Sequence, residues 1–138
     1  MNTSGETNLT QLIRSMQPSL ADECFIFCTV AESVAISLIP QALGIFHEVE
    51  GVTLILEKEV AVAHQIQFCG EWAKITLTVH SSLEAVGFLA AISQPLAAAG
   101  ISTNVISAFY HDHVFVQWDR RELALEILRQ LATNTSQS

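Results

Sequence analysis

The chain has 138 residues, of which 50% are hydrophobic and 14% charged, and its formal net charge is −8. The apolar content excludes a disordered chain, and six Lys and Arg against fourteen Asp and Glu argue against binding to nucleic acid. Polar residues or Pro interrupt every apolar stretch before about 18 residues, so we expect no membrane span. This length suits one domain or two small modules.

The N-terminal segment and the cysteines favour a cytoplasmic protein. The segment MNTSGETNLT lacks the basic and apolar regions of a secretion signal. Cys24, Cys28 and Cys69 form no CxxC pair, and Cys24 and Cys28 lie in an apolar run, so we expect buried free thiols. We expect residues 133–138 to form a frayed polar tail.

The first half of the chain predicts short elements. The β-branched and aromatic run CFIFCTV predicts a buried strand at residues 24–30. Residues 31–40 are apolar but too short for a clear assignment. The other expected elements are a helix at 9–16, a hairpin at 44–57 with its turn at Glu50-Gly51, a helix at 58–64 and a strand at 65–68.

The second half has clearer periodicity. We expect a helix that Ser81 or Ser82 caps and that runs to Ala99, with a kink at Pro95. The remaining expected elements are strands at 73–80, 101–109 and 113–118, and a helix at 120–131 capped by Asp119.

Residues 50–58 (EGVTLILEK) resemble residues 112–120 (DHVFVQWDR), which indicates an internal repeat. Each copy reads as strand, crossover, strand, strand and helix, with the crossover helix lost or reduced in the first copy. The second copy has the order βαββα, a ferredoxin-like unit without its last strand. Either a strand of the first half, such as 24–30, completes its sheet, or two chains pair their sheets.

The second half resembles an ACT domain. The run ITLTVHSSLEAVG, the phrase AGIS-x-NV and the hairpin YHDH-x-FV, all within residues 72–116, carry the resemblance. The segments LTQLIRSMQPSL, FIFCTV and EGVTLILEK resemble the degenerate first module of small bacterial tandem-ACT proteins. The resemblance implies an α+β protein with two ferredoxin-like βαββαβ modules in tandem, their antiparallel sheets covered by helices on one face. We place these modules at 1–69, the degenerate one, and 70–138.

The resemblance also implies a function: a regulatory module that binds a small effector, an amino acid, without catalysis, and that forms a homodimer. The family binds effectors where the loop after the first strand meets the second strand of a neighbouring module. Asn104 matches a phrase of aspartate kinases in which an Asn follows the Gly-Ile of the helix–strand turn. The positions that match the family's site are His80, Ser81, Ser82, Glu84, Ala85, Val86, Gly87, Asn104, Val105 and Ile106. No cofactor and no metal are expected.

The chemistry of these positions suits an amino acid. Its carboxylate needs donors once water is displaced, and free backbone amides at the start of a helix after Ser82 would supply them. The side chain of Asn104 can both donate and accept hydrogen bonds. Gly87 would allow close approach of the backbone. Ser81 and Ser82 fit plain helix caps equally well.

Three other interpretations remain open. His111 and His113 lie two residues apart and share a face of a strand, so with His80 they could bind a divalent metal or form a metal-dependent enzyme. A hydrolase built from Ser81 or Ser82, a His and Asp112 lacks a nucleophile elbow. A structural module would bind no ligand. Trp72 and Trp118 are expected to anchor a core or an interface.

Overall fold

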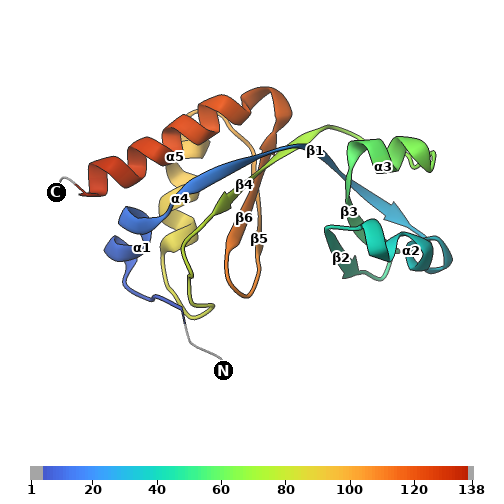
Figure 1. Ribbon diagram of the computed structural model, residues 1–138, viewed down its shortest axis with the longest axis horizontal. Helices are drawn as coiled ribbons and strands as arrows, with labels where there is room; N and C mark the ends of the chain where they lie inside the picture. Colours follow the sequence, from blue (N-terminus) through green and yellow to red (C-terminus); the bar gives the residue numbers. More distant parts are fainter. Residues whose placement is uncertain (1–4, 137–138) are drawn as a thin grey trace. The chain divides into compact units, whose positions relative to one another are not determined.

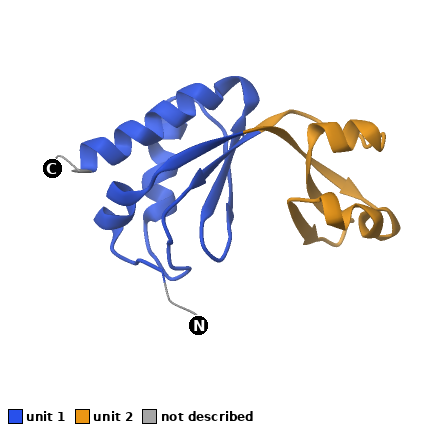
Figure 2. Ribbon diagram, in the orientation of Figure 1, with its two compact units in different colours: residues 1–21, 73–138 blue, residues 22–72 orange. Residues whose placement is uncertain are grey.

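The computed structural model describes residues 5–136 and divides into two compact units (Figures 1 and 2). Unit 1 comprises residues 1–21 and 73–138, and unit 2 comprises residues 22–72. The hydrogen-bonded strand order is β2-β3-β1-β4-β6-β5. Strand β1 (Pro18–Val30) passes from one unit into the other between Ala21 and Asp22.

Unit 1 has the ferredoxin-like strand order β1-β4-β6-β5. Its core joins the apolar faces of the strands to those of α1, α4 and α5, which lie on the same side of the strands in Figure 1. The first part of β1 stands where the βαββα order lacks its last strand. Of the two alternatives, a strand of the first half therefore fills this place; it is the strand that contains residues 24–30, although unit 1 takes only its part up to Ala21. Apart from the first residue of β4, which belongs to unit 2, the elements of unit 1 are α1 (Leu9–Ser15), β4 (Trp72–Leu77), α4 (Phe88–Ala98), β5 (Thr103–Ser107), β6 (Asp112–Gln117), the 3-10 turn η2 (Trp118–Arg120) and α5 (Arg121–Ser136).

Unit 2 is a smaller antiparallel unit. The second part of β1 pairs with β3 from Phe25↔Glu57 to Val30↔Val52. The crossover between β1 and β2 is only a helix of seven residues and one 3-10 turn, so the reduced crossover is confirmed. Its elements are β2 (Gly44–His47), β3 (Val52–Glu57), α2 (Glu32–Leu38), η1 (Ile39–Gln41) and α3 (Lys58–Ala63).

In the first half, the expected hairpin and the helices near residues 9–16 and 58–64 are confirmed. The side chain of Asn8 caps α1 by accepting a hydrogen bond from the amide of Gln11 at 3.0 Å. The segment 31–40 is helical. The strand expected at 65–68 is wrong, because these residues form a turn and a loop whose apolar side chains pack against the core of unit 2.

In the second half, the three expected strands are present with trimmed ends. The expected frayed tail is wrong for residues 133–136, which continue α5 as Ala132 packs against the core; residues 137–138 lie outside the described part. Asp119 lies within the 3-10 turn that precedes α5. Helix α4 continues across Pro95.

The three cysteines are free, as expected, but they differ in burial: Cys28 is buried, Cys24 is half-buried and Cys69 is exposed. The described residues contain no helix that is long and apolar enough to cross a membrane.

Candidate functional site

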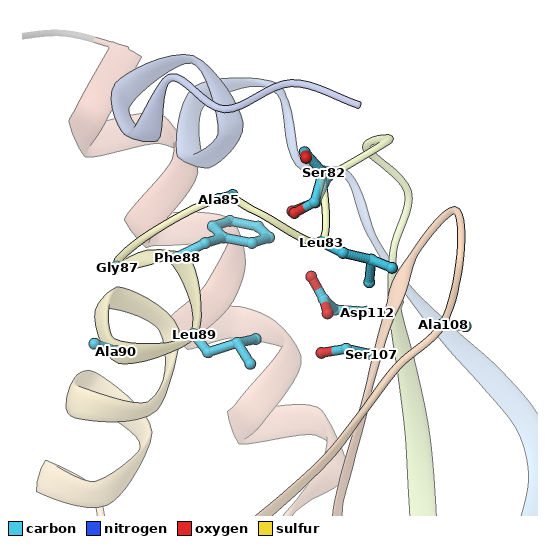
Figure 3. Close-up of a pocket in the computed structure, with 11 residues that line it drawn as sticks. Ser82, Leu83, Ala85, Gly87, Phe88, Leu89, Ala90, Ser107, Ala108 and Asp112 are labelled. Carbon is cyan, nitrogen blue, oxygen red and sulfur yellow. The ribbon is translucent and has the colours of Figure 1, made fainter. Parts of the chain in front are cut away.

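Unit 1 contains a cavity of about 200 Å³ between the β4–α4 loop, the start of α4 and the β5–β6 hairpin (Figure 3). This volume is below the range of about 300–1,000 Å³ that is typical of sites for drug-sized ligands, so it suits a small metabolite. The lining residues are Ser81, Ser82, Leu83, Ala85, Gly87, Phe88, Leu89, Ala90, Ser107, Ala108 and Asp112.

The β4–α4 loop is not the first turn of a helix, so the expected helix start after Ser82 is wrong. The hydroxyl of Ser82 accepts a hydrogen bond from the amide of Glu84 at 3.1 Å and thereby closes only a local turn. Leu83 and Val86, which lie in this loop, are 70% and 84% exposed. The helix begins at Phe88, after Gly87 at φ 90°.

The N-terminal segment holds this loop in place. Glu6 donates its amide to the carbonyl of His80 at 2.8 Å and accepts a hydrogen bond from the amide of Ser82 at 3.0 Å. These bonds form a parallel bridge between Glu6 and Ser81. The amide of Ser82 is therefore engaged by the chain itself and is not free for a ligand carboxylate.

The start of α4 supplies free donors instead. Gly87 has no side chain to cap the helix, and the first backbone bond into α4 runs from the amide of Ala91 to the carbonyl of Gly87 at 2.9 Å. The amides of Phe88, Leu89 and Ala90 have no hydrogen-bond partner among the described residues, and all three residues line the cavity. Such amides, together with the helix dipole, favour a negative group.

Asp112 brings a negative charge to the same cavity. It is the first residue of β6, it pairs with Ser107 across the hairpin, and it is only 7% exposed. Figure 3 shows the carboxylate of Asp112 and the hydroxyl of Ser107 turned into the cavity. Within the described part of the chain, no hydrogen bond or ion pair reaches this carboxylate.

Only four of the ten positions matched to the family's site line the cavity. Ser81, Ser82, Ala85 and Gly87 line the cavity. His80 packs instead against Tyr110, with ring centroids 5.0 Å apart. The positions that do not line the cavity are His80, Glu84, Val86, Asn104, Val105 and Ile106, and the last three lie on β5.

Sequence reasoning missed Asp112 and Ser107 as cavity residues. A signal was present, because strand alternation places Asp112 on the same face as Val114 and Val116, which are fully buried. A carboxylate on the core face of a strand indicates a site. Leu83 and residues 88–90 were missed because the helix was expected to begin too early.

His111, which precedes β6, and His113, which lies in it, both contact protein groups. Nδ1 of His111 lies 3.2 Å from the carbonyl of Val79, and Nδ1 of His113 lies 2.9 Å from the hydroxyl of Thr76. The pKa of His113 is lowered, first by burial and then by the charges of Lys74 and His111. In the described residues, no three His, Cys, Asp or Glu side chains come together as a metal site.

Of the two tryptophans expected to anchor a core or an interface, Trp118 does so and Trp72 makes an edge-to-face aromatic contact. Trp118 packs against the core of unit 1 and lies beneath the guanidinium of Arg121, 3.9 Å from the ring centroid. Trp72 meets Phe27 edge to face at 6.1 Å within unit 2.

Comparison with known proteins identifies the family. Two models of the ACT domain match this chain, one at residues 4–71 and one at residues 70–130. A solved Vibrio cholerae protein of unknown function, described as a possible transport protein, is 43% identical, with a TM-score of 0.81 over 90% of this chain and 95% of its own. No curated protein matches the chain.

More distant solved structures share the fold. An Agrobacterium tumefaciens protein is 16% identical, with a TM-score of 0.69 over 85% of this chain and 89% of its own. The regulatory subunit of aspartate kinase from Thermus thermophilus is 13% identical, with a TM-score of 0.65 over 86% of this chain and 97% of its own. The chain therefore belongs to the ACT-domain proteins and carries two such domains in tandem.

Proposed function

We propose that this protein is a regulatory module without catalytic activity and that it binds a free amino acid in the cavity of unit 1. The observation that carries the proposal is the uncapped start of α4: the amides of residues 88–90 have no partner among the described residues, and these residues line a small cavity of about 200 Å³. These amides are suited to the carboxylate of the amino acid. The hydroxyls of Ser82 and Ser107 supply further hydrogen-bonding groups.

Regulation would act through assembly. We infer a homodimer that pairs along β5, because β5 is the edge strand of the sheet and leaves one side of its backbone open. Asn104 and Ile106, both exposed on β5, would then meet the second copy. A bound amino acid would favour one arrangement of the copies by its differential affinity for that arrangement. The three free thiols are consistent with the cytoplasm.

A thermal-shift screen of the twenty amino acids and common divalent metals tests the proposal. A hit at a hundredfold excess over Kd adds about 2.7 kcal/mol of stability. We expect stabilisation by one or a few amino acids and none by metals. If no amino acid raises the melting temperature, the proposed function is wrong.

Two variants locate the site. Ala108→Phe would fill the cavity and should abolish the shift, whereas Asn104→Ala lies outside the cavity and should preserve binding to one chain. Light scattering of wild type and Asn104→Ala, with and without the amino acid, then reports the oligomeric state. Loss of the shift in Asn104→Ala alone would place the site at the β5 edge rather than in the cavity.

A further inference from the structure

We propose that Asp112 is the receptor for a primary ammonium group, so that the cavity accepts the amino form of a metabolite and rejects its deaminated form. The inference rests on the proposed function of the cavity and goes further, because it assigns the group that selects the ligand.

A buried carboxylate needs a partner. Asp112 is 93% hidden from solvent, and no hydrogen bond or ion pair within residues 5–136 reaches its side chain. No side-chain oxygen of the described residues is both fully buried and unpartnered, so the carboxylate of Asp112 meets solvent only through the cavity. A ligand that fills the cavity would displace this water and must then compensate the negative charge. The position is therefore one that a bound cation would stabilise.

The chain supplies no such cation among the described residues that line the cavity. The lining consists of Ser, Ala, Leu, Gly and Phe residues and of Asp112 itself. The two basic neighbours in the sequence do not line the cavity: the ring of His111 contacts the carbonyl of Val79, and that of His113 contacts the hydroxyl of Thr76. The counter-charge must therefore arrive with the ligand.

The donor set favours an ammonium over a metal ion. Divalent cations are held by several oxygen ligands, mostly carboxylates, and the lining contains a single carboxylate. An ammonium has three donors, which two carboxylate oxygens of Asp112 and the hydroxyl of Ser107 can accept. Both side chains point into the cavity from the hairpin (Figure 3).

The start of α4, at the other end of the cavity, suits the second charged group of an amino acid, its carboxylate. Phe88 and Leu89 lie across the cavity from Asp112 and Ser107 in Figure 3. Their amides have no partner among the described residues and, at the start of a helix, suit a negative group. A ligand with an ammonium and a carboxylate therefore satisfies both ends. A hydroxy acid of the same skeleton satisfies only the amide end and leaves Asp112 unpaired.

Matched ligands test this selection without knowledge of the natural one. Three triples serve as probes: L-alanine, L-lactate and ethylamine; L-serine, L-glycerate and ethanolamine; L-leucine, L-2-hydroxyisocaproate and isoamylamine. Calorimetry on the wild type should show, for at least one triple, an amino acid that binds at least tenfold more tightly than its hydroxy acid. Equal binding of amino and hydroxy acids in every triple that binds would overturn the inference.

The variant Asp112→Asn keeps the shape and removes the charge. We expect it to weaken amino-acid binding at least tenfold and to bring the ratio between amino acid and hydroxy acid close to one. Asp119→Asn removes an exposed charge outside the cavity and should leave both affinities unchanged. A ratio that persists in Asp112→Asn means that another group reads the ammonium.

The unliganded variant separates a binding role from a structural one. Because its carboxylate has no partner in the described structure, Asp112→Asn should melt at or above the temperature of the wild type without ligand. A markedly lower melting temperature would mean that Asp112 supports the fold, and it would overturn the inference. If amino acids bind but are not preferred over hydroxy acids, only the role of Asp112 fails; if no probe and no amino acid binds, the proposed function fails as well.

Discussion

Gly5 lies where the N-terminal segment crosses the β4–α4 loop, in direct contact with that loop's backbone. A Cβ at this position would come within 2.6 Å of the carbonyl oxygen of His80, the carbonyl carbon of Ser81 and the amide nitrogen of Ser82. Backbone atoms cannot move aside as a flexible side chain can. We therefore expect Gly5→Ala to separate the two segments and to lower the free energy of unfolding by about 1–3 kcal/mol, measured by urea denaturation.

Gly44→Ala is the matched control for this substitution. Its Cβ would meet only the side chain of Ile55, with Cδ1 nearest at 3.1 Å, and that side chain can rotate. A smaller loss is expected there. Equal losses in the two variants would show that the N-terminal segment does not hold the loop.

His113 gives the protein a predictable dependence on pH. Burial, Lys74 and His111 lower its pKa in the folded state, whereas the unfolded chain takes up the proton near the ordinary value of about 6.5. The contribution of neutral His113 to the free energy of unfolding is therefore fully present above about pH 6.5. It is lost as the pH falls from there through the pKa of His113 in the folded state. Urea denaturation at pH 7.5 and 5.5 should show that the free energy of unfolding falls less between these pH values in His113→Gln than in the wild type. Identical losses would contradict this assignment.

At the scale of elements, the sequence predicts an element well where one local signal decides it. The hairpin of β2 and β3 follows from alternating apolar residues on either side of Gly51. The β4–α4 loop was mispredicted because Ser82 is followed by apolar residues at helical spacing. Two features override that pattern: a backbone hydrogen bond from Ser82 to the distant Glu6, and the positive φ of Gly87. Neither can be read from local periodicity. The sequence therefore predicted four residues of the loop that line the cavity (Ser81, Ser82, Ala85 and Gly87), but not those at the start of α4.

Helix α4 contains Pro95 in its interior, where it lacks the N–H that would bond to the carbonyl of Ala91. The helix persists because Ile92 and Leu96 are fully buried. Pro95→Ala should therefore raise the free energy of unfolding by about 1–3 kcal/mol. This range allows for the opposing effect of Pro, which restricts the unfolded chain and so lowers its conformational entropy. Thermal melting measures the gain, with the exposed Gln94→Ala as a control expected to change stability by less than about 0.5 kcal/mol. A destabilised Pro95→Ala would mean that the packing of α4 requires the proline.

At the scale of the whole molecule, unit 1 is discontinuous in sequence. Its core takes Leu12, Ile13 and Met16 from the N-terminal segment and the remainder from residues 73–138. The repeat and the family resemblance predicted two successive modules, and the boundary between residues 69 and 70 stays a prediction. Pairings between distant segments, such as β1 with β4, leave no mark in a local pattern.

This organisation predicts how the chain can be divided. A chain that joins residues 1–21 to 73–138 through a short Gly/Ser linker contains all of unit 1 and should unfold cooperatively on heating, measured by circular dichroism. Residues 70–138 alone lack α1 and the first part of β1, so they should show no cooperative transition. If the shorter chain melted as sharply and at the same temperature, those N-terminal parts would be dispensable for the fold.

The route of strand β1 through both units has a consequence for biosynthesis. Translation releases α1 before α5, against which it packs. Residues 22–72 can complete their own core while the ribosome is still producing α4 and α5. The apolar side of α1 therefore stays exposed until α4 and α5 are synthesised, and we expect chaperones that act on nascent chains to bind it during this interval.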